Sequence, residues 1–435
     1  MSYTVNHRHK RFIFLLGITA VYTALLTWLN FLNGPFWADE HTFWATTLTF
    51  SDRLLPTLDT LRDYNELNTP LPFIIFGALE YLFGQGIWLG RLFNLVLSIG
   101  ILFVVGWPSA GGQKGRLLCA VGILICPYYL MFSGRLYTEM IACTYGLLGM
   151  MSYVRNRHLL SCIAFVLAIS SRQYMIAFPI AIAAYEFLAS FIQVLSLRKF
   201  DDRPQWRTQW RTQWRTQWRA QWRTQWRTQW RWIAPTLATL SYLGWIYLFD
   251  GLAPATATEI RSTPVVQQTA WAFSPGVAVN FLAVIGAYIV IPEFLLFQPI
   301  TKLKAVIVHR RYVALAALGL FLVFLVFPPI PSTRGGTAQI ADLLPTEGLK
   351  LAFLYCLVLL ACIRFYKPNL VTFIVFANSL MMIKAHPWDK YILPVVIIFW
   401  YLKSIGFEEN FGTLFKPIHD ESTLENVVNI EVSGQ

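Results

Sequence analysis

The chain has 435 residues, of which 56% are hydrophobic and only 13% are charged, and its formal net charge is +12. Several apolar runs are long enough to cross the roughly 30 Å hydrocarbon layer as helices, which excludes an ordinary soluble fold and indicates an all-α polytopic membrane protein. Seven positive charges belong to one arginine repeat, and the remaining +5 suits basic cytoplasmic loops, so the charge does not indicate a nucleic-acid partner.

The first apolar run, residues 12–32, follows the basic stretch His7 to Arg11 and resembles the start of a signal peptide. Its length of roughly 21 apolar residues exceeds the core of a signal peptide, and no small-residue cleavage site follows, so we expect a retained anchor. In all, the pattern predicts about twelve transmembrane helices, at residues 12–32, 87–107, 117–132, 140–154, 159–171, 174–197, 232–249, 277–297, 312–328, 350–363, 369–385 and 391–403.

Residues 71–83 are apolar but number only about 13, and they include Glu80. If they lie along the membrane, 20 basic residues after position 107 are cytoplasmic and 7 are external, or 13 and 7 without the repeat. If they cross, this bias inverts, which the positive-inside rule disfavours. We therefore expect cytoplasmic termini, a membrane domain over 1–403 whose first external loop (33–86) holds juxtamembrane helices, and a cytoplasmic tail over 404–435. The expected membrane is the inner or plasma membrane, or the endoplasmic reticulum in a eukaryote.

A tandem repeat occupies residues 205–231, with seven copies of Gln-Trp-Arg in the expected cytoplasmic loop 198–231. Its period of four overshoots the 3.6-residue helical turn by about 40° per copy, so the tryptophans would wind round a helix without forming one apolar face. The repeat is either an interfacial segment on anionic headgroups or, as we favour, a tolerated loop insertion. Stacking on single-stranded nucleic acid is a weaker alternative.

The cysteines show no CxxC spacing and lie in apolar runs, which favours small buried side chains over disulfide bonds or metal ligands. They are Cys119, Cys126, Cys143, Cys162, Cys356 and Cys362.

The first external loop begins with an acidic pair, Asp39 and Glu40, beside Trp37. A carboxylate just beyond a helix end at interface depth can accept a proton from a hydroxyl group whose reaction partner stays anchored in the bilayer. The alternative for an Asp-Glu dipeptide is an ordinary solvated loop. Because adjacent residues do not point the same way on a helix, the pair does not imply a two-carboxylate metal site; a divalent metal is left open, and no other cofactor is expected.

Four basic residues fall on the same expected side as Asp39, and they are Arg135, Arg172, Arg334 and Lys390. Arginine at bilayer depth is costly and usually has a partner. For each of these cations considered alone, the simplest partner is a carboxylate of the protein such as Glu139. Together, the four cations suggest a shared anion, which in a membrane is a lipid-linked phosphate.

The pattern resembles the GT-C membrane glycosyltransferases, and within them the protein O-mannosyltransferase and aminoarabinose-transferase type. The resemblance covers residues 10–190 by motif and the rest by architecture only. Its motifs are the acidic pair, the segment Thr69-Pro70-Leu71-Pro72-Phe73 with Phe83-Gly84 after it, Gly90-Arg91-Leu92-Phe93-Asn94, and the Arg-x-x-x-Glu loop from Arg135 to Glu139. The Ser171-Arg172-Gln173 tripeptide and the His386-Pro387 loop are also similar to the dolichyl-phosphoglucose α-1,2-glucosyltransferases.

The resemblance implies transfer of a sugar from a polyprenyl-phosphate donor, with inversion, to a lipid, glycan or protein acceptor on the external or lumenal face. Asp39 carries over as the general base and Glu40 as its neighbour in the motif. Glu139 falls where relatives often place an aspartate. The four cations are the expected donor-phosphate ligands, and the further expected substrate contacts are Tyr137, Glu139, Gln173, His386 and Asp389.

Two other classes of function fit the same residues. A transporter or flippase of lipid-linked saccharides would use the cations to hold phosphate but would need no base. Inverted repeats or helices broken at mid-membrane would favour it, and the sequence displays neither. A non-catalytic scaffold would use the Trp/Arg repeat as its interaction element.

The charge bias yields a topological prediction. Single cysteines at Tyr137, Ser332 and Trp388 should react with an impermeant reagent added outside, whereas cysteines at Asn156, Thr212 and Lys367 should be protected, because the basic loops stay in the cytoplasm. The measurement is labelling of intact cells with all native cysteines replaced. Reaction at position 156 without reaction at 137 would contradict this topology.

Overall fold

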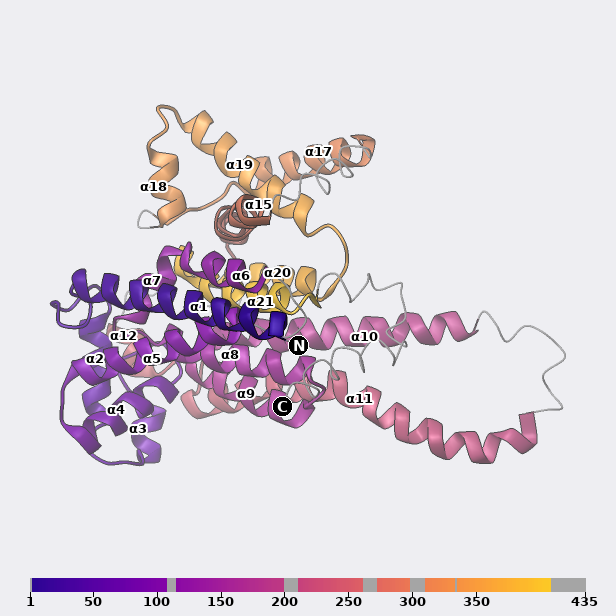
Figure 1. Ribbon diagram of the computed structural model, residues 1–435, viewed down its shortest axis with the longest axis horizontal. Helices are drawn as coiled ribbons and strands as arrows, with labels where there is room; N and C mark the ends of the chain where they lie inside the picture. The colour runs from indigo at the N-terminus through magenta and orange to yellow at the C-terminus, as the bar shows by residue number, and fades with distance from the viewer. Residues whose placement is uncertain are drawn as a thin grey trace.

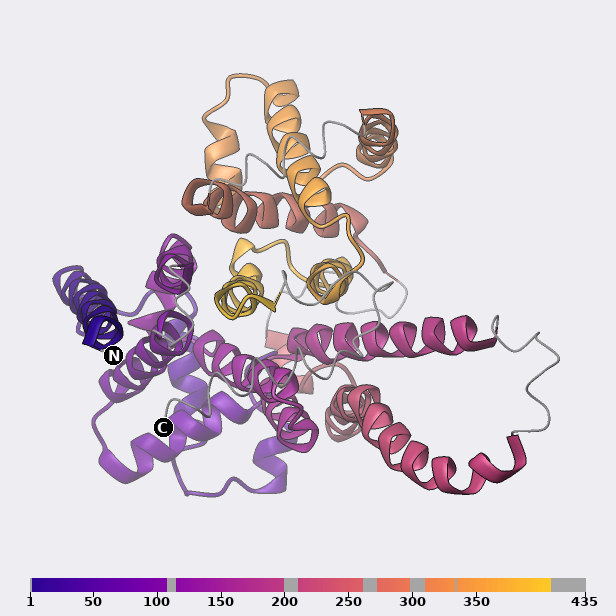
Figure 2. The same ribbon diagram turned by 45° about the vertical axis from the view of Figure 1, so that its right-hand side comes forward.

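The computed structural model describes residues 2–107, 115–198, 210–260, 272–297, 310–332 and 335–407, and every regular element among them is a helix. The expected all-α class therefore holds for this part of the chain. Long helices run side by side in a bundle, and short helices gather at one end of it (Figures 1 and 2). The tail over 408–435 and Arg334 lie outside the described residues.

The helices of the first half are α1 (Ser2–Trp28), α2 (Glu40–Thr49), α3 (Leu58–Arg62), α4 (Leu71–Phe83), α5 (Ile87–Gly106), α6 (Gly115–Leu124), α7 (Pro127–Ser133), α8 (Glu139–Val154), α9 (His158–Ser171) and α10 (Ala177–Arg198), preceded by the short turn η1 (Gln173–Ile176). Those of the second half are α11 (Trp210–Phe249), α12 (Ala255–Ile260), α14 (Pro275–Ile285), the π-helical turn η3 (Gly286–Val290), α15 (Ile291–Phe297), α17 (Arg310–Val326), α18 (Gly336–Asp342), α19 (Glu347–Arg364), α20 (Leu370–Met381), η4 (Met382–Lys384), η5 (Asp389–Ile392) and α21 (Leu393–Ser404).

Four helical stretches are long and apolar enough to cross a membrane, and they are Ile87–Gly106, Gln173–Ile192, Gln229–Phe249 and Pro275–Phe297. The bent pair α6 and α7 makes a fifth if it counts as one span. The remaining predicted spans also coincide with helices, such as α8 and α21, but these are shorter. The described residues thus have four or five helices suited to a membrane, and the number twelve stays a prediction.

The helix expected over residues 117–132 is broken. Its two parts, α6 and α7, meet at an angle of 73°. The chain turns at Cys126, and Pro127 begins α7, because proline is favoured in the first turn of a helix and cannot continue one from the preceding turn. The break corrects the expectation of one unbroken helix over 117–132 and of no broken helix in the chain.

Polar contacts join the loops at one end of the bundle, here named the Asp39 end. Lys390 binds Asp39, and the Thr69 hydroxyl donates to the Ile169 carbonyl at 2.8 Å. The Asp63 carboxylate likewise accepts from the Thr256 amide at 3.0 Å. Loops that the topology places on the external side therefore contact one another.

The other end of the bundle, here named the Glu293 end, is held by a second set of contacts. Glu293 of α15 binds Arg364 of α19 and Lys403 of α21, with N–O distances of 2.5 and 2.6 Å. Arg231 donates to Asn156 at 3.0 Å between α11 and the loop after α8. These residues lie near ends of predicted spans that the expected topology assigns to the cytoplasmic side.

Helix α4 begins and ends at the Asp39 end. Thr69, just before it, bonds to Ile169, and Arg91, in the first turns of α5 just after it, bonds to Glu40. The helix stops at Gly84, whose φ of 58° is a left-handed conformation that glycine adopts without a steric penalty. This geometry is what a segment that does not cross the membrane requires.

Helices α14 to α19 form a separate layer above α20 and α21 (Figures 1 and 2). Their own apolar cluster centres on Ala283, Leu357 and Val358. At the Asp39 end this layer is fastened by Asp389, which accepts hydrogen bonds from the Thr337 amide and hydroxyl at 2.9 and 2.5 Å. Glu293 fastens it at the opposite end.

Burial corrects two expectations. Cys119, Cys126 and Cys143 are buried as expected, but Cys356 and Cys362 are exposed on α19. Tyr137 and Ser332 are buried, so cysteines at these positions would be shielded whichever side they face. Trp388 and Lys367 are the informative pair for the labelling experiment.

The backbone of α11 is helical from Trp210 in the repeat to Phe249 in an apolar span, without interruption, and at roughly 1.5 Å per residue its 40 residues reach about 60 Å. This is twice the hydrocarbon thickness, so half of the helix would project beyond a membrane. Figure 1 shows this part of α11 extending away from the other helices, near the end of α10.

The repeat should be dispensable for any chemistry at the Asp39 end. Deleting residues 209–228 removes five whole repeats and keeps Arg231, which anchors α11 to Asn156. We expect activity of the purified protein to stay within a few-fold of the wild type, because the period of the repeat forms no single apolar face and the expected topology assigns the repeat to the side opposite Asp39. Complete loss of activity in a normally folded deletion variant would show that the repeat has a direct role.

Candidate functional site

A buried ion pair between Glu40 and Arg91 holds segments of the Asp39 end together. Glu40 is fully buried and Arg91 is 2% exposed. The Arg91 guanidinium donates to both Glu40 oxygens at 2.9 Å. Its remaining N–H groups donate to the carbonyls of Leu32, Gly34 and Pro35 at 2.7 to 3.2 Å. All five guanidinium donors are therefore used, and they fix the chain between α1 and α2.

Glu40 also holds the loop between α7 and α8. One of its oxygens accepts from the Leu136 amide at 2.7 Å, and the other accepts from the Trp37 amide at 3.1 Å. From α5, the Asn94 side chain donates to the carbonyls of Arg135 and Tyr137 at 2.7 and 2.8 Å. The loop residues from Arg135 to Tyr137 are thus fixed against α2 and α5 by polar contacts on both sides.

A second cluster connects Asp39 to the last loop of the chain. The Lys390 ammonium lies 3.0 Å from Asp39 and 3.9 Å from Glu139. Arg172 forms an ion pair with Glu139 and also donates to Asn68. Burial lowers the pKa of Lys390, while the attraction of Glu139 and Asp39 acts in the opposite direction. Asp39 keeps 27% of its side chain exposed, whereas Glu139 is fully buried.

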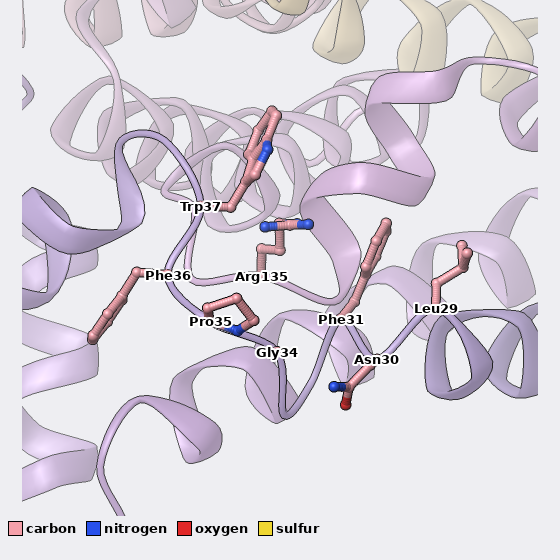
Figure 3. Close-up of a pocket in the computed structure, with 8 residues that line it drawn as sticks. All are labelled: Leu29, Asn30, Phe31, Gly34, Pro35, Phe36, Trp37 and Arg135. Atoms are coloured by element: carbon pink, nitrogen blue, oxygen red, sulfur yellow. The ribbon is translucent and has the colours of Figure 1, made fainter.

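Beside these clusters lies a pocket of about 220 Å³, lined by Leu29, Asn30, Phe31, Gly34, Pro35, Phe36, Trp37 and Arg135. Figure 3 shows the Arg135 guanidinium between two aromatic rings, and its centre is 4.5 Å from the ring of Phe31 and 4.7 Å from that of Trp37. Arg135 is 14% exposed and lies 3.7 Å from Glu40, and its buried Nε has no hydrogen-bond partner among the described residues. Burial lowers its pKa, against the attraction of Glu40.

The charges around Glu40 do not balance. This single carboxylate faces two guanidiniums, and Arg91 occupies both of its oxygens at hydrogen-bond distance. Around Lys390 and Arg172, by contrast, two cations meet two carboxylates. The uncompensated positive charge therefore lies at Arg135, on the pocket side, where an anion would be attracted.

The structure brings together six of the residues singled out from the sequence, and they are Asp39, Glu40, Arg135, Glu139, Arg172 and Lys390. Tyr137 lies among them, buried and stacked on Phe132 at 4.5 Å. Lys390 and Arg172, expected as phosphate ligands, have carboxylates as their partners.

Other expected contacts lie apart from the pocket. The Gln173 amide donates to the Leu67 carbonyl. His386 packs against Trp388 at 4.8 Å, and Asp389 is directed to α18 through Thr337. Arg334 lies outside the described residues.

Sequence reasoning gave no role to Arg91 or Asn94, although both stand in the quoted motif at the start of α5. The sequence feature that could have identified them is a pair of polar side chains three residues apart in a mostly apolar helix. This spacing places the two side chains near one face of the helix. Among the described residues no three His, Cys, Asp or Glu side chains are arranged to hold a metal ion. The charged side chains that meet at the Asp39 end are carboxylates, guanidiniums and one ammonium group.

Replacing Glu40 by glutamine should destabilise the fold by roughly 3–5 kcal/mol, because Arg91 would be left as a buried charge without its counter-ion. The matched control is Glu347→Gln, which removes an exposed ion pair with Lys350 and should cost about 1 kcal/mol or less. Denaturant unfolding of both variants in detergent measures the difference. Equal stability of the two variants would show that the Glu40 pair does not organise this end.

No protein-family model matches the chain, and comparisons with curated proteins and with solved structures give no significant match.

Proposed function

We propose that this chain is a polytopic membrane glycosyltransferase that moves a sugar from a polyprenyl-phosphate donor to an acceptor hydroxyl, with inversion at the anomeric carbon. The observation that carries the proposal is the pairing of two features at the Asp39 end. One is a partly exposed carboxylate, Asp39, held by a lysine. The other is Arg135, a cation with a free donor beside a pocket.

Arg135 is our assignment for the donor phosphate. A sugar-phosphate-polyprenyl diester carries one negative charge, which matches the one uncompensated guanidinium in the pocket. The pocket is also lined by Leu29 and Phe31, at and beyond the end of the apolar helix α1, where a polyprenyl chain would leave toward lipid. As the sugar departs, negative charge develops on the phosphate. A guanidinium stabilises this charge by hydrogen bonding, without transferring a proton.

Asp39 is our assignment for the general base. The acceptor hydroxyl attacks the anomeric carbon, its proton passes to Asp39, and the bond from that carbon to the phosphate oxygen breaks. Lys390 orients the carboxylate, and Glu139 with Arg172 holds Lys390 in place. Glu40, buried under five contacts, then serves to position Asp39 and Arg135 and does not meet substrate.

The proposal includes about twelve membrane spans, cytoplasmic termini and an external or lumenal Asp39 end. Support comes from the charge bias and from the contacts that gather the expected external loops at one end and the expected cytoplasmic loops at the other. The acceptor is a lipid, a glycan or a protein that approaches from the aqueous side.

A transporter of lipid-linked saccharides is the second candidate, and the break between α6 and α7 favours it. Transporter sites are often built at broken helices. Here, however, α7 leads into the loop that Glu40 and Asn94 hold, and within the described part of the chain no hydrogen bond or ion pair of the cluster involves residues 125–126, where the helix breaks. The break thus allows the loop with Arg135 and Tyr137 to lie at the Asp39 end.

Replacing Asp39 by asparagine separates these candidates. The variant keeps the shape of the side chain but lacks the proton acceptor, so transfer should fall by about 10²-fold or more while donor binding persists. The assay follows sugar leaving a radiolabelled polyprenyl phosphosugar in proteoliposomes supplied with a membrane extract as the source of acceptor. Asp52→Asn, at an exposed acid of the same loop, should transfer normally. Full turnover by Asp39→Asn would favour the transporter.

A further inference from the structure

Trp37 is the most exposed side chain in direct contact with the Arg135 guanidinium. It is 41% exposed and lines the pocket. One face of its indole covers Arg135, whose other face lies against Phe31. Figure 3 shows the indole standing beyond the guanidinium, at the side of the pocket away from Phe31. A partly exposed aromatic side chain therefore lies directly next to the Arg135 guanidinium, which Glu40 approaches only to 3.7 Å.

The backbone holds Trp37 in this position. Its carbonyl accepts from the Glu40 amide at 3.0 Å, and its own amide donates to the Glu40 carboxylate at 3.1 Å. Between Trp37 and Asp39, Ala38 has a φ of 47°, a left-handed conformation that is unfavourable for alanine. Such strain persists only where the surroundings impose it, and it concentrates at functional sites. The strained turn fixes Trp37 and Asp39 relative to each other.

We propose that Trp37 is the platform on which the pyranose ring of the donor sugar stacks, an inference that rests on the proposed function. The C–H face of a pyranose is weakly positive and packs on the electron-rich face of an indole. With the phosphate at Arg135, the sugar is the next group along the donor, and Trp37 is the lining residue that contacts Arg135 and stands two positions before Asp39 in the chain. Stacking there holds the anomeric carbon between the departing phosphate and the base.

Phe36 provides a matched comparison, because an exposed aromatic residue at this depth also serves as an interfacial membrane anchor. It is 46% exposed, precedes Trp37 directly and lines the same pocket. Its ring, however, packs edge-on against His41 at 5.6 Å and touches no cation. An anchoring role would therefore make the two residues about equally important, whereas a sugar platform makes only Trp37 important.

The test compares two synthetic ligands of equal charge in equilibrium binding to the full chain in nanodiscs. One is a short-chain polyprenyl phosphoglucose, with the phosphomannose as a second sugar. The other is the corresponding polyprenyl methyl phosphate, which keeps the phosphodiester and lacks the sugar. Trp37→Ala should weaken phosphosugar binding by about tenfold and leave methyl phosphate binding within about twofold. Trp37→Phe should retain most of the preference, and Phe36→Ala should change the two affinities by the same factor or not at all, so that the preference for the phosphosugar stays.

Three results would overturn the platform. These are an equal loss of both ligands in Trp37→Ala, an equal effect of Phe36→Ala, or no sugar preference in the wild type. Arg135→Gln tests the proposed function separately, because it should weaken both ligands alike. If Arg135→Gln leaves both affinities unchanged, the phosphate assignment fails, whereas a sugar-specific loss in Trp37→Ala would still show the platform.

Discussion

The ion pair between Arg91 and Glu40 is the interaction on which the Asp39 end depends. Arg91 uses all five of its donors, two on Glu40 and three on the chain leaving α1. Glu40 in turn binds the amides of Trp37 and Leu136. A charge pair this deep is stable only because every lone pair and proton has a partner. Its consequence is that Trp37, Asp39 and Arg135, from two distant loops, have fixed relative positions.

The two buried ion clusters have different roles in the proposed site. Around Lys390 the charges balance, so that cluster holds Asp39 without attracting a further anion. Around Glu40 the charges do not balance. The excess positive charge is on Arg135, whose guanidinium lies between two aromatic rings that exclude water from its faces. An anion that enters the pocket meets the largely buried Arg135 guanidinium, where a charge-assisted hydrogen bond is stronger than in water.

The sequence predicted most of the helices because apolar runs and their polar interruptions mark helices directly. The segment 71–83 coincides with α4, and the run from 87 with α5. It also placed Asp39, Arg135 and Lys390 on one side from loop charge alone. It could not predict the pairing of Glu40 with Arg91, 51 residues away, because this depends on the turn at Ala38. Nor could it predict that Cys356 and Cys362 are exposed, since lipid-facing and buried helix faces are equally apolar.

The most direct test of the account is mass spectrometry of lipid-linked sugars in cells that lack the protein and are complemented with either the wild type or Asp39→Asn. The account predicts that one polyprenyl phosphosugar accumulates in the deletion strain, disappears with the wild type and persists with Asp39→Asn, while one glycosylated product follows the opposite pattern. An unchanged set of lipid-linked sugars in the deletion strain, or full rescue by Asp39→Asn, would contradict it.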